Sequence, residues 1–120
     1  MKKTILFVDD EKDLVEMVRS HLEAYGYDVV TACTGKEALE KARAGHIDLM
    51  LLDIMMPGIS GYDVLSELKN DPATSRIKVI MLTAKSETSS LLKAQSLGAA
   101  DYVIKPFDFG ELISLIKRYI

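Results

Sequence analysis

The stretch LMLLDIMMPG, residues 49–58, decides the fold, because four apolar residues lead directly into Asp53 and the chain then breaks at Pro57 and Gly58. A short, uninterrupted apolar run is typical of a strand that is buried on both faces of a parallel sheet. Such a strand carries Asp53 to the rim of the sheet, where a carboxylate can meet solvent. Acidic residues end many strands, so the meaning of Asp53 depends on the rest of the chain.

Similar apolar runs alternate with helical periodicity on both sides of this stretch. Strands are predicted over residues 5–8, 27–32, 49–52, 77–82 and 102–104. Helices are predicted over residues 14–25, 34–45, 60–68, 87–97 and 108–119. Strands and helices that alternate five times with short connections indicate a parallel sheet with helices on both faces. The sequence therefore predicts one doubly wound α/β domain over residues 1–120, flavodoxin-like, with the strand order 2-1-3-4-5.

The positions of several polar residues support these helix starts. Thr34 stands three residues before Glu37, which is the spacing of a capping box, in which each side chain bonds the other residue's backbone N–H. Ser60 precedes Asp63 at the same distance, and Asp108 precedes Glu111. Leu14, Val15, Val18, Leu22 and Tyr25 form the predicted apolar face of the first helix.

Composition excludes several classes of protein. The chain has 120 residues, 48% of them hydrophobic, and a net charge of −3 with no basic run, so we expect no direct binding to nucleic acid. Its one cysteine, Cys33, excludes an internal disulfide and a CxxC site. No segment has the pattern of a signal peptide or the length of a membrane span, so we expect a cytoplasmic protein that does not enter a membrane.

Polar residues follow four of the five predicted strands. Asp9 and Asp10 follow the first strand, Asp53 ends the third, Thr83 follows the fourth and Lys105 follows the fifth. In open α/β sheets, ligands bind outside the carboxyl ends of the strands at the point where the strand order reverses. With the order 2-1-3-4-5 these four strands are neighbours, so we expect the five side chains to converge on one rim.

The chemistry of this set suits a phosphoryl group. Carboxylates that crowd together raise one another's pKa or recruit a cation. Mg²⁺ is a hard cation that is commonly held by one or two carboxylates, waters and a phosphate. The Thr83 hydroxyl and the Lys105 ammonium could contact phosphoryl oxygens from other sides. Asp53, on the central strand, is then the natural nucleophile, because carboxylates can form aspartyl-phosphates.

These residues and their neighbours resemble the receiver domain of two-component response regulators, in particular its chemotaxis-regulator type. The resemblance rests on Asp9-Asp10, on Asp53 within LLDIMMPG, on Thr83-Ala84 and on Lys105-Pro106-Phe107, and it covers the whole chain. All of these motifs in one order and at this spacing are highly specific for the family. The resemblance implies a phosphoprotein of a phosphorelay, a signalling domain rather than an enzyme of steady turnover.

The resemblance also assigns roles at the site. Asp53 would accept a phosphoryl group from a phosphohistidine of a sensor histidine kinase or phosphotransfer protein. Asp10, Asp53 and the backbone carbonyl of Met55 would hold Mg²⁺, with Asp9 acting through water. Lys105 would contact the phosphoryl oxygens.

A conformational switch is implied by the same resemblance. Thr83 would move toward the phosphorylated aspartate, and Tyr102 would rotate inward behind it. The fourth helix, fifth strand and fifth helix would then present a changed surface to an output partner or output domain. The peptide bond between Lys105 and Pro106 is expected to be cis. Met55 and Lys85 occupy positions that face the attacking water during dephosphorylation, and the apolar Met55 predicts a persistent phosphoryl group.

Plainer interpretations of single residues stay open at this point. Asp9 and Asp10 could cap a helix, Thr83 could cap the next one, Lys105 could be a solvated loop lysine, and Tyr102 could be a packing residue. His21 and His46 lack metal-ligand spacing, and we expect both at the surface. Most of the methionines at positions 17, 50, 55, 56 and 81 are expected to fill the core. Met55 and Met56 are expected in the loop over the site and partly exposed.

The residues of the predicted site argue against three competing functions. A phosphohydrolase resembling the haloacid dehalogenases would need an acid at position 55, where this chain has Met55. A flavin carrier would need a phosphate-cradling loop in place of Asp9-Asp10-Glu11. A receiver-like fold that acts without phosphorylation would not need the complete acidic set. The chain is a stand-alone receiver or part of a longer protein, and either a monomer or a phosphorylation-dependent dimer. Gly110 stands where dimerising receivers commonly carry Arg, so Asp101 and Lys117 remain as the possible charges for a dimer contact.

Overall fold

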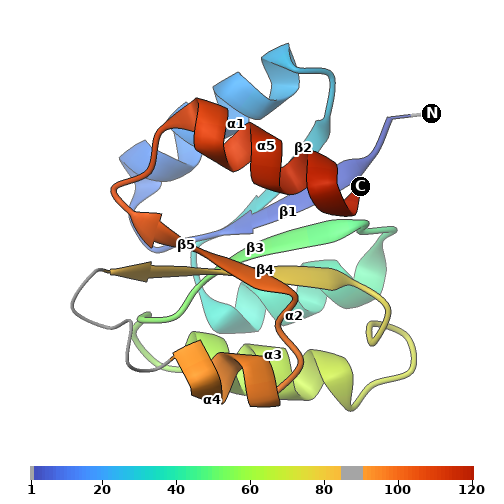
Figure 1. The fold of residues 1–120 in the computed structure, drawn as a ribbon. Helices are drawn as coiled ribbons and strands as arrows, with labels where there is room; N and C mark the ends of the chain where they lie inside the picture. The colour runs from blue at the N-terminus through green and yellow to red at the C-terminus, as the bar shows by residue number, and fades with distance from the viewer. Residues whose placement is uncertain (1, 85–90) are drawn as a thin grey trace.

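The computed structural model describes residues 2–84 and 91–120, and within them five parallel strands form one sheet in the order β2-β1-β3-β4-β5 (Figure 1). This is the predicted topology. The strands are β1 (Thr4–Val8), β2 (Asp28–Ala32), β3 (Leu49–Asp53), β4 (Lys78–Ala84) and β5 (Asp101–Lys105). The helices are α1 (Lys12–Ala24), α2 (Gly35–Ala44), α3 (Gly61–Lys69), α4 (Leu91–Ser96) and α5 (Phe109–Tyr119).

The sheet separates two hydrophobic cores. Helices α1 and α5 cover one face, and α2, α3 and α4 cover the other (Figure 1). Strand β3 lies in the middle, and all five of its residues are buried. Because side chains alternate along a strand, Leu49 and Leu51 pack toward α1 and α5, while Met50 and Leu52 pack toward α2 and α3. The two-sided burial explains the uninterrupted apolar run.

The three helix starts predicted at Thr34, Ser60 and Asp108 are confirmed, with one difference in a hydrogen bond. Ser60 and Asp63 form the complete capping box, and Asp108 accepts a hydrogen bond from the backbone N–H of Glu111 at 2.7 Å. Thr34 accepts from the N–H of Glu37 as expected, but the Glu37 carboxylate bonds the N–H of Cys33, at 2.7 Å, rather than that of Thr34. The N-terminus of α2 is therefore tied to the residue that follows β2.

Other expectations needed correction. Tyr25 was assigned to the apolar face of α1 but is 56% exposed, because it is the C-terminal cap, where the helical periodicity ends. Met56, which was expected to be partly exposed, is buried, and Met17 is exposed. Met55 is exposed and Met50 and Met81 fill the core, as expected. Strand β4 extends to Ala84, beyond the predicted end at residue 82. Of the helix predicted over 87–97, residues 91–96 form α4; positions 87–90 and Lys85 lie outside the described residues.

Candidate functional site

The backbone at the carboxyl end of the sheet fixes where the polar side chains begin. Asp53 is the last residue of β3 and pairs in register with Leu82 of β4. Asp9 follows β1 directly, and its N–H donates to the carbonyl of Ala32 at 3.1 Å, which continues the ladder with β2. Lys105 ends β5 opposite Ala84. The predicted convergence on one rim is confirmed for Asp9, Asp10, Asp53 and Lys105.

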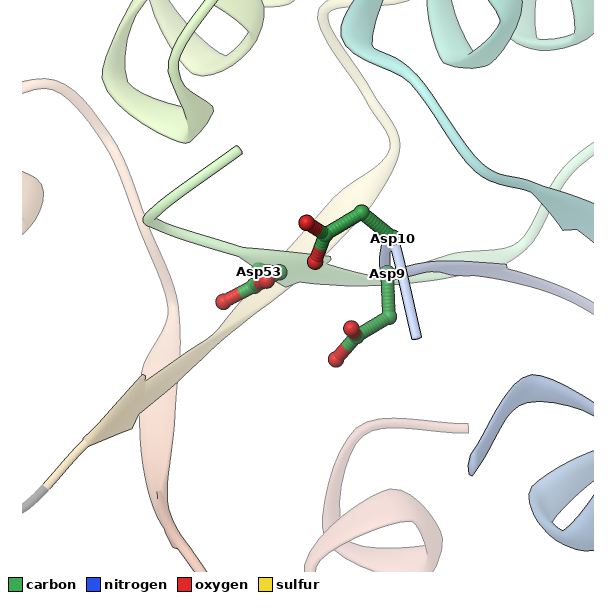
Figure 2. Close-up of side chains that lie close together, drawn as sticks. All are labelled: Asp9, Asp10 and Asp53. Carbon is green, nitrogen blue, oxygen red and sulfur yellow. The ribbon is translucent and has the colours of Figure 1, made fainter. Parts of the chain in front are cut away.

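Three carboxylates meet at this rim. Asp9, Asp10 and Asp53 each place an oxygen within 4.8 Å of the others, and Figure 2 shows the two side chains from the end of β1 beside the one from β3. Asp9 is completely buried, Asp53 is 6% exposed and Asp10 faces solvent. No other group of three potential metal ligands forms among the residues described here. His21 and His46, which were expected at the surface, are both exposed.

Lys105 is the cation that faces these acids. Its Nζ lies 2.5 Å from Oδ2 of Asp9 and 3.7 Å from Oδ2 of Asp53. A third carboxylate, Oε1 of Glu11, lies 3.5 Å away. Burial alone would lower the pKa of Lys105, but these acids together raise it above its ordinary value, so the side chain is charged. Lys105 is 18% exposed and is an ion-pair partner of the site, not a solvated loop lysine.

One lysine does not neutralise the acids. Burial, and after it the neighbouring charge of Asp9, raise the pKa of Asp53 to about 7, although Lys105 and a hydrogen bond from the Met55 backbone oppose the effect. The pKa of Asp9 is also raised, again chiefly by burial, although Lys105 opposes the effect. Buried carboxylates that are short of positive charge form a set of hard oxygen donors, and such a set fits a divalent cation like Mg²⁺.

The helix-capping interpretation of the first two acids is wrong. The residue that caps α1 is Glu11, and its own side chain makes no capping bond. Asp9 instead accepts a hydrogen bond from the N–H of Glu11 at 3.0 Å, which orients its carboxylate within the site. Sequence reasoning did not include Glu11 among the site residues. Its position directly after Asp10 was a signal that could have included it.

Thr83 and Tyr102 lie on the same face of the sheet. Thr83 pairs in register with Ile104, and Tyr102 pairs with Met81, so alternation places both side chains toward α2, α3 and α4. Asp53 and Lys105 occupy the opposite phase, toward α1 and α5. Thr83 is buried, and its hydroxyl donates to the carbonyl of Ala84 at 3.2 Å.

Tyr102 points outward in this structure, with 45% of its surface exposed. It borders a groove of about 390 Å³ between α4 and β5. The groove is lined by Leu92, Ala94, Gln95, Ala99, Ala100, Asp101 and Tyr102. The ring is therefore not a buried packing residue, and an open space lies beside it.

The loop of residues 54–60 follows Asp53 and borders the site. Ile54 and Met56 are buried in the core beneath the loop, while the side chain of Met55 is 62% exposed. The Met55 backbone donates a hydrogen bond to Asp53. The expected cis peptide bond between Lys105 and Pro106 is present.

Comparison with known proteins gives a consistent result. The family model described as the response regulator receiver domain matches residues 5–117. The chain is 46% identical over 109 residues to the response regulator SaeR of Staphylococcus epidermidis, covering 91% of the chain and 46% of that relative. It is 42% identical over 116 residues to SaeR of Staphylococcus aureus, covering 97% of the chain and 50% of that relative. The chain thus spans about half the length of these curated relatives.

Solved structures show the same fold. The chemotaxis protein CheY4 of Vibrio cholerae superposes with a TM-score of 0.94 at 28% identity, with complete coverage of both chains. The response regulator TrrA of Thermotoga maritima, solved in complex with Mg²⁺-BeF, has a TM-score of 0.87 at 39% identity and covers 98% of this chain and 99% of its own. No helix among the described residues combines the length and the apolar character needed to cross a bilayer.

Proposed function

The chain belongs to the response regulator receiver domain family of two-component systems, and we propose that its phosphoacceptor is Asp53. The phosphoryl group would come from a phosphohistidine of a sensor histidine kinase or a phosphotransfer protein. One observation carries this assignment: Asp53 is a buried carboxylate at the end of the central strand, between two further acids and a lysine. A nucleophile for phosphoryl transfer needs this kind of positioning and charge compensation more than it needs elaborate covalent chemistry.

Asp10, Asp53 and the Met55 carbonyl are the ligands that we propose for Mg²⁺, with Asp9 acting through water. The crowding of the three carboxylates and the raised pKa of Asp53 support this assignment. When bound, Mg²⁺ neutralises the acids and draws negative charge from the phosphoryl oxygens. That TrrA was solved with Mg²⁺-BeF is consistent with such chemistry in the family.

The transfer itself is a displacement at phosphorus. An oxygen of Asp53 attacks in line, the new P–O bond forms, and the P–N bond to the donor imidazole breaks. The imidazole nitrogen leaves with the electron pair and takes up a proton. Lys105, which lies 3.7 Å from Asp53, donates hydrogen bonds to the phosphoryl oxygens as the negative charge spreads over them.

Phosphorylation would then bias a two-state rearrangement through Thr83 and Tyr102. The two side chains share a face of the sheet, and the groove beside Tyr102 leaves room for its ring to move. We propose that this movement changes the surface of α4, β5 and α5 for an output partner or output domain. Leu92, which is 77% exposed on α4, is a candidate contact on that surface.

Incubation with Mg²⁺ and a small phosphodonor tests the central assignment. Wild-type protein is expected to gain the mass of one phosphoryl group and to bind beryllofluoride, and Asp53→Asn is expected to do neither. Thr83→Ala and Tyr102→Ala would take up phosphate but lose the change in partner binding. Uptake by Asp53→Asn equal to that of the wild type would overturn the proposal.

Met55 sets the expected lifetime of the phosphoryl group. Its exposed, apolar side chain is two residues after Asp53, and we expect it to hinder the water that hydrolyses the acyl phosphate. Met55→Asn should therefore shorten the lifetime of the phosphoprotein, measured by the decay of the phosphorylated mass. Leu92→Asn, which removes another exposed apolar side chain, from α4, is the control and should leave the decay unchanged.

Several expectations stay predictions. They are slow autodephosphorylation, the boundaries of the domain at residues 1–120, a cytoplasmic location and the absence of direct nucleic-acid binding. The protein is expected to be a monomer or a phosphorylation-dependent dimer. Two charges available for a dimer contact already have partners within the chain: Asp101 accepts a hydrogen bond from Tyr119 at 2.8 Å, and Lys117 lies over the ring of Tyr25.

A further inference from the structure

Two glycines begin the helices that flank the phosphoacceptor loop. Gly35 is the first residue of α2 and Gly61 is the first residue of α3. Neither has a positive φ, so backbone conformation does not require glycine at these positions. Gly58, in the loop between Asp53 and α3, is the opposite case: its φ is +80°, and a side chain there would meet nothing within 4 Å. At Gly35 and Gly61 the reason for glycine must therefore be the lack of room for a side chain.

Gly61 fits against the backbone of the phosphoacceptor itself. A Cβ at this position would lie 2.3 Å from the carbonyl oxygen of Asp53 and 2.8 Å from Cα of Ile54. The N–H of Gly61 donates to the carbonyl of Ile54 at 2.8 Å, which closes the base of the loop of residues 54–60. The base of the loop is therefore fixed against β3.

Gly35 supports the same loop from a distant part of the chain. A Cβ at this position would lie 2.9 Å from Cγ2 of Val64, 3.0 Å from the carbonyl oxygen of Ile59 and 3.1 Å from Cβ of Ile59. All three distances are shorter than ordinary van der Waals contacts.

The N-terminus of α2 has little freedom to retreat from this contact. Thr34 accepts a hydrogen bond from the N–H of Glu37 at 3.1 Å, and Glu37 accepts one from the N–H of Cys33 at 2.7 Å. Glu37 is also paired with Lys41 at 3.4 Å. A side chain at Gly35 would therefore displace Ile59 and the loop rather than the helix.

From this packing we infer that Gly35 is a positioning residue for the phosphoacceptor site, acting through Ile59 on the loop that carries Met55. The inference rests on the proposed function, because Met55 is the proposed backbone ligand of Mg²⁺. The backbone of Met55 also donates a hydrogen bond to Asp53, so a shift of the loop changes the environment of the nucleophile. The exposed Met55 side chain does not anchor the loop. The position of the loop depends instead on the buried side chains of Ile54 and Met56 and on the close packing at Gly35 and Gly61.

Gly35→Ala tests the inference, with Gly45→Ala as a matched control. Gly45 is the C-terminal cap of the same helix, and a Cβ there would meet only a carbonyl oxygen at 3.9 Å. Mg²⁺ affinity is measured by NMR titration of each variant, well below its own melting transition. Gly35→Ala is expected to bind Mg²⁺ about 10-fold more weakly, the lower end of what the loss of an outer support of a metal site costs. Gly45→Ala is expected to match the wild type.

A second variant separates positioning from general destabilisation. Val64→Ala removes the atom nearest to the new Cβ, while the carbonyl of Ile59 stays close. The double variant Gly35→Ala, Val64→Ala should recover part of the Mg²⁺ affinity but still bind more weakly than Val64→Ala alone. The backbone amide resonances of Met55 and Asp53 should shift in Gly35→Ala before any metal is added. If Gly35→Ala does not fold, the double variant against Val64→Ala makes the same comparison.

The possible outcomes distinguish this inference from the function on which it rests. If the wild type and Gly45→Ala bind Mg²⁺ and Gly35→Ala binds it equally well, Gly35 is a packing residue and the inference is wrong, even if the melting temperature falls. If the wild type itself does not bind Mg²⁺, the proposed metal site is wrong and the inference falls with it.

Discussion

Strand β3 has an aspartate at each end, and the two carboxylates are in opposite situations. Asp48 directly precedes the strand and accepts a hydrogen bond from the N–H of Thr4 at 2.8 Å. Its own N–H donates to the carbonyl of Thr4 at 2.9 Å, and His46 contacts its other oxygen at 3.0 Å. The hydrogen bond from Thr4 holds the pKa of Asp48 below its ordinary value. Asp48 therefore joins β1 to β3 and is stable as an anion.

Asp53, at the other end, is buried among charges of its own sign. Its pKa is raised to about 7 by burial and by Asp9, and Lys105 lies closer to Asp9 than to Asp53. Burial raises the pKa of both carboxyls, but the hydrogen bond from Thr4 outweighs it at Asp48, and nothing outweighs it at Asp53. The difference is that Asp48 has donors that satisfy its charge and Asp53 lacks enough of them. A bound cation would supply the missing positive charge.

The largest expected effect is on phosphorylation. Asp53→Asn should abolish the uptake of a phosphoryl group and of beryllofluoride, because it removes the nucleophile. Asp48→Asn, at the opposite end of the same strand, should retain both. Intact-mass measurement after incubation with Mg²⁺ and a small phosphodonor checks this. Equal loss in both variants would show that the two ends of β3 are not functionally distinct.

The second-largest expected effect is on the free energy of unfolding in the absence of Mg²⁺. Its sign is opposite for Asp53 and Asp48, the aspartates at the two ends of β3. The Asp53 carboxyl has an ordinary pKa of 3.8, which is raised to about 7 in the folded protein, so ionisation destabilises the native state as pH rises between these values. Asp53→Asn should raise the free energy of unfolding at pH 7 by about 1–3 kcal/mol. Urea titrations in EDTA should show that this gain disappears below pH 4 and shrinks when Mg²⁺ is added. A lower free energy of unfolding for Asp53→Asn at pH 7 would contradict the claim that the ionised Asp53 carboxylate destabilises the folded protein.

Asp48→Asn should have a smaller effect in the other direction. The anion is favoured in the folded state, so its stabilisation is present above the ordinary pKa of 3.8 and is lost as pH falls through the lower folded-state pKa. The variant should be about 1 kcal/mol less stable than the wild type at pH 7, since the amide oxygen still accepts from Thr4 but the charge is gone. The same urea titrations at pH 7 and at pH 3 check this, and a difference that persists unchanged at low pH would be inconsistent with it.

The smallest expected effect comes from an exposed aspartate, which lies at the same edge of the sheet as Asp48. Asp28 begins β2 and is 3.9 Å from the amine of Lys2, with both side chains about 60% exposed. Asp28→Asn should change the free energy of unfolding by less than about 0.5 kcal/mol, because exposed ion pairs contribute little. An effect as large as that of Asp48→Asn would show that the contribution of an aspartate to stability depends on its position at this edge rather than on hydrogen-bond donors to its carboxylate.

Most of the fold was predictable because its signals are local. The apolar run of β3 is a signal within one strand. The polar pairs that begin α3 (Ser60 and Asp63) and α5 (Asp108 and Glu111) are signals within one helical turn. The alternation of strands and helices then left few topologies. The errors came where a local pattern ended. The predicted apolar face of α1 was extended to Tyr25, which is exposed because the helix ends before it. The Glu37 carboxylate accepts from the N–H of Cys33, one residue earlier than the capping pattern predicts.

The sequence by itself determined the order of the elements, the rim at which their polar residues meet and the identity of the acids, Thr83 and Lys105 at that rim. Only the tertiary structure decided how the charges are shared: Lys105 pairs most closely with Asp9, Glu11 joins it, and Asp53 is left with too little compensation. It also decided that Gly35, from another helix, lies against the loop of the phosphoacceptor. The physical reason is range, because periodicity and capping act between near neighbours, whereas burial, ion pairing and close packing depend on segments that only folding brings together.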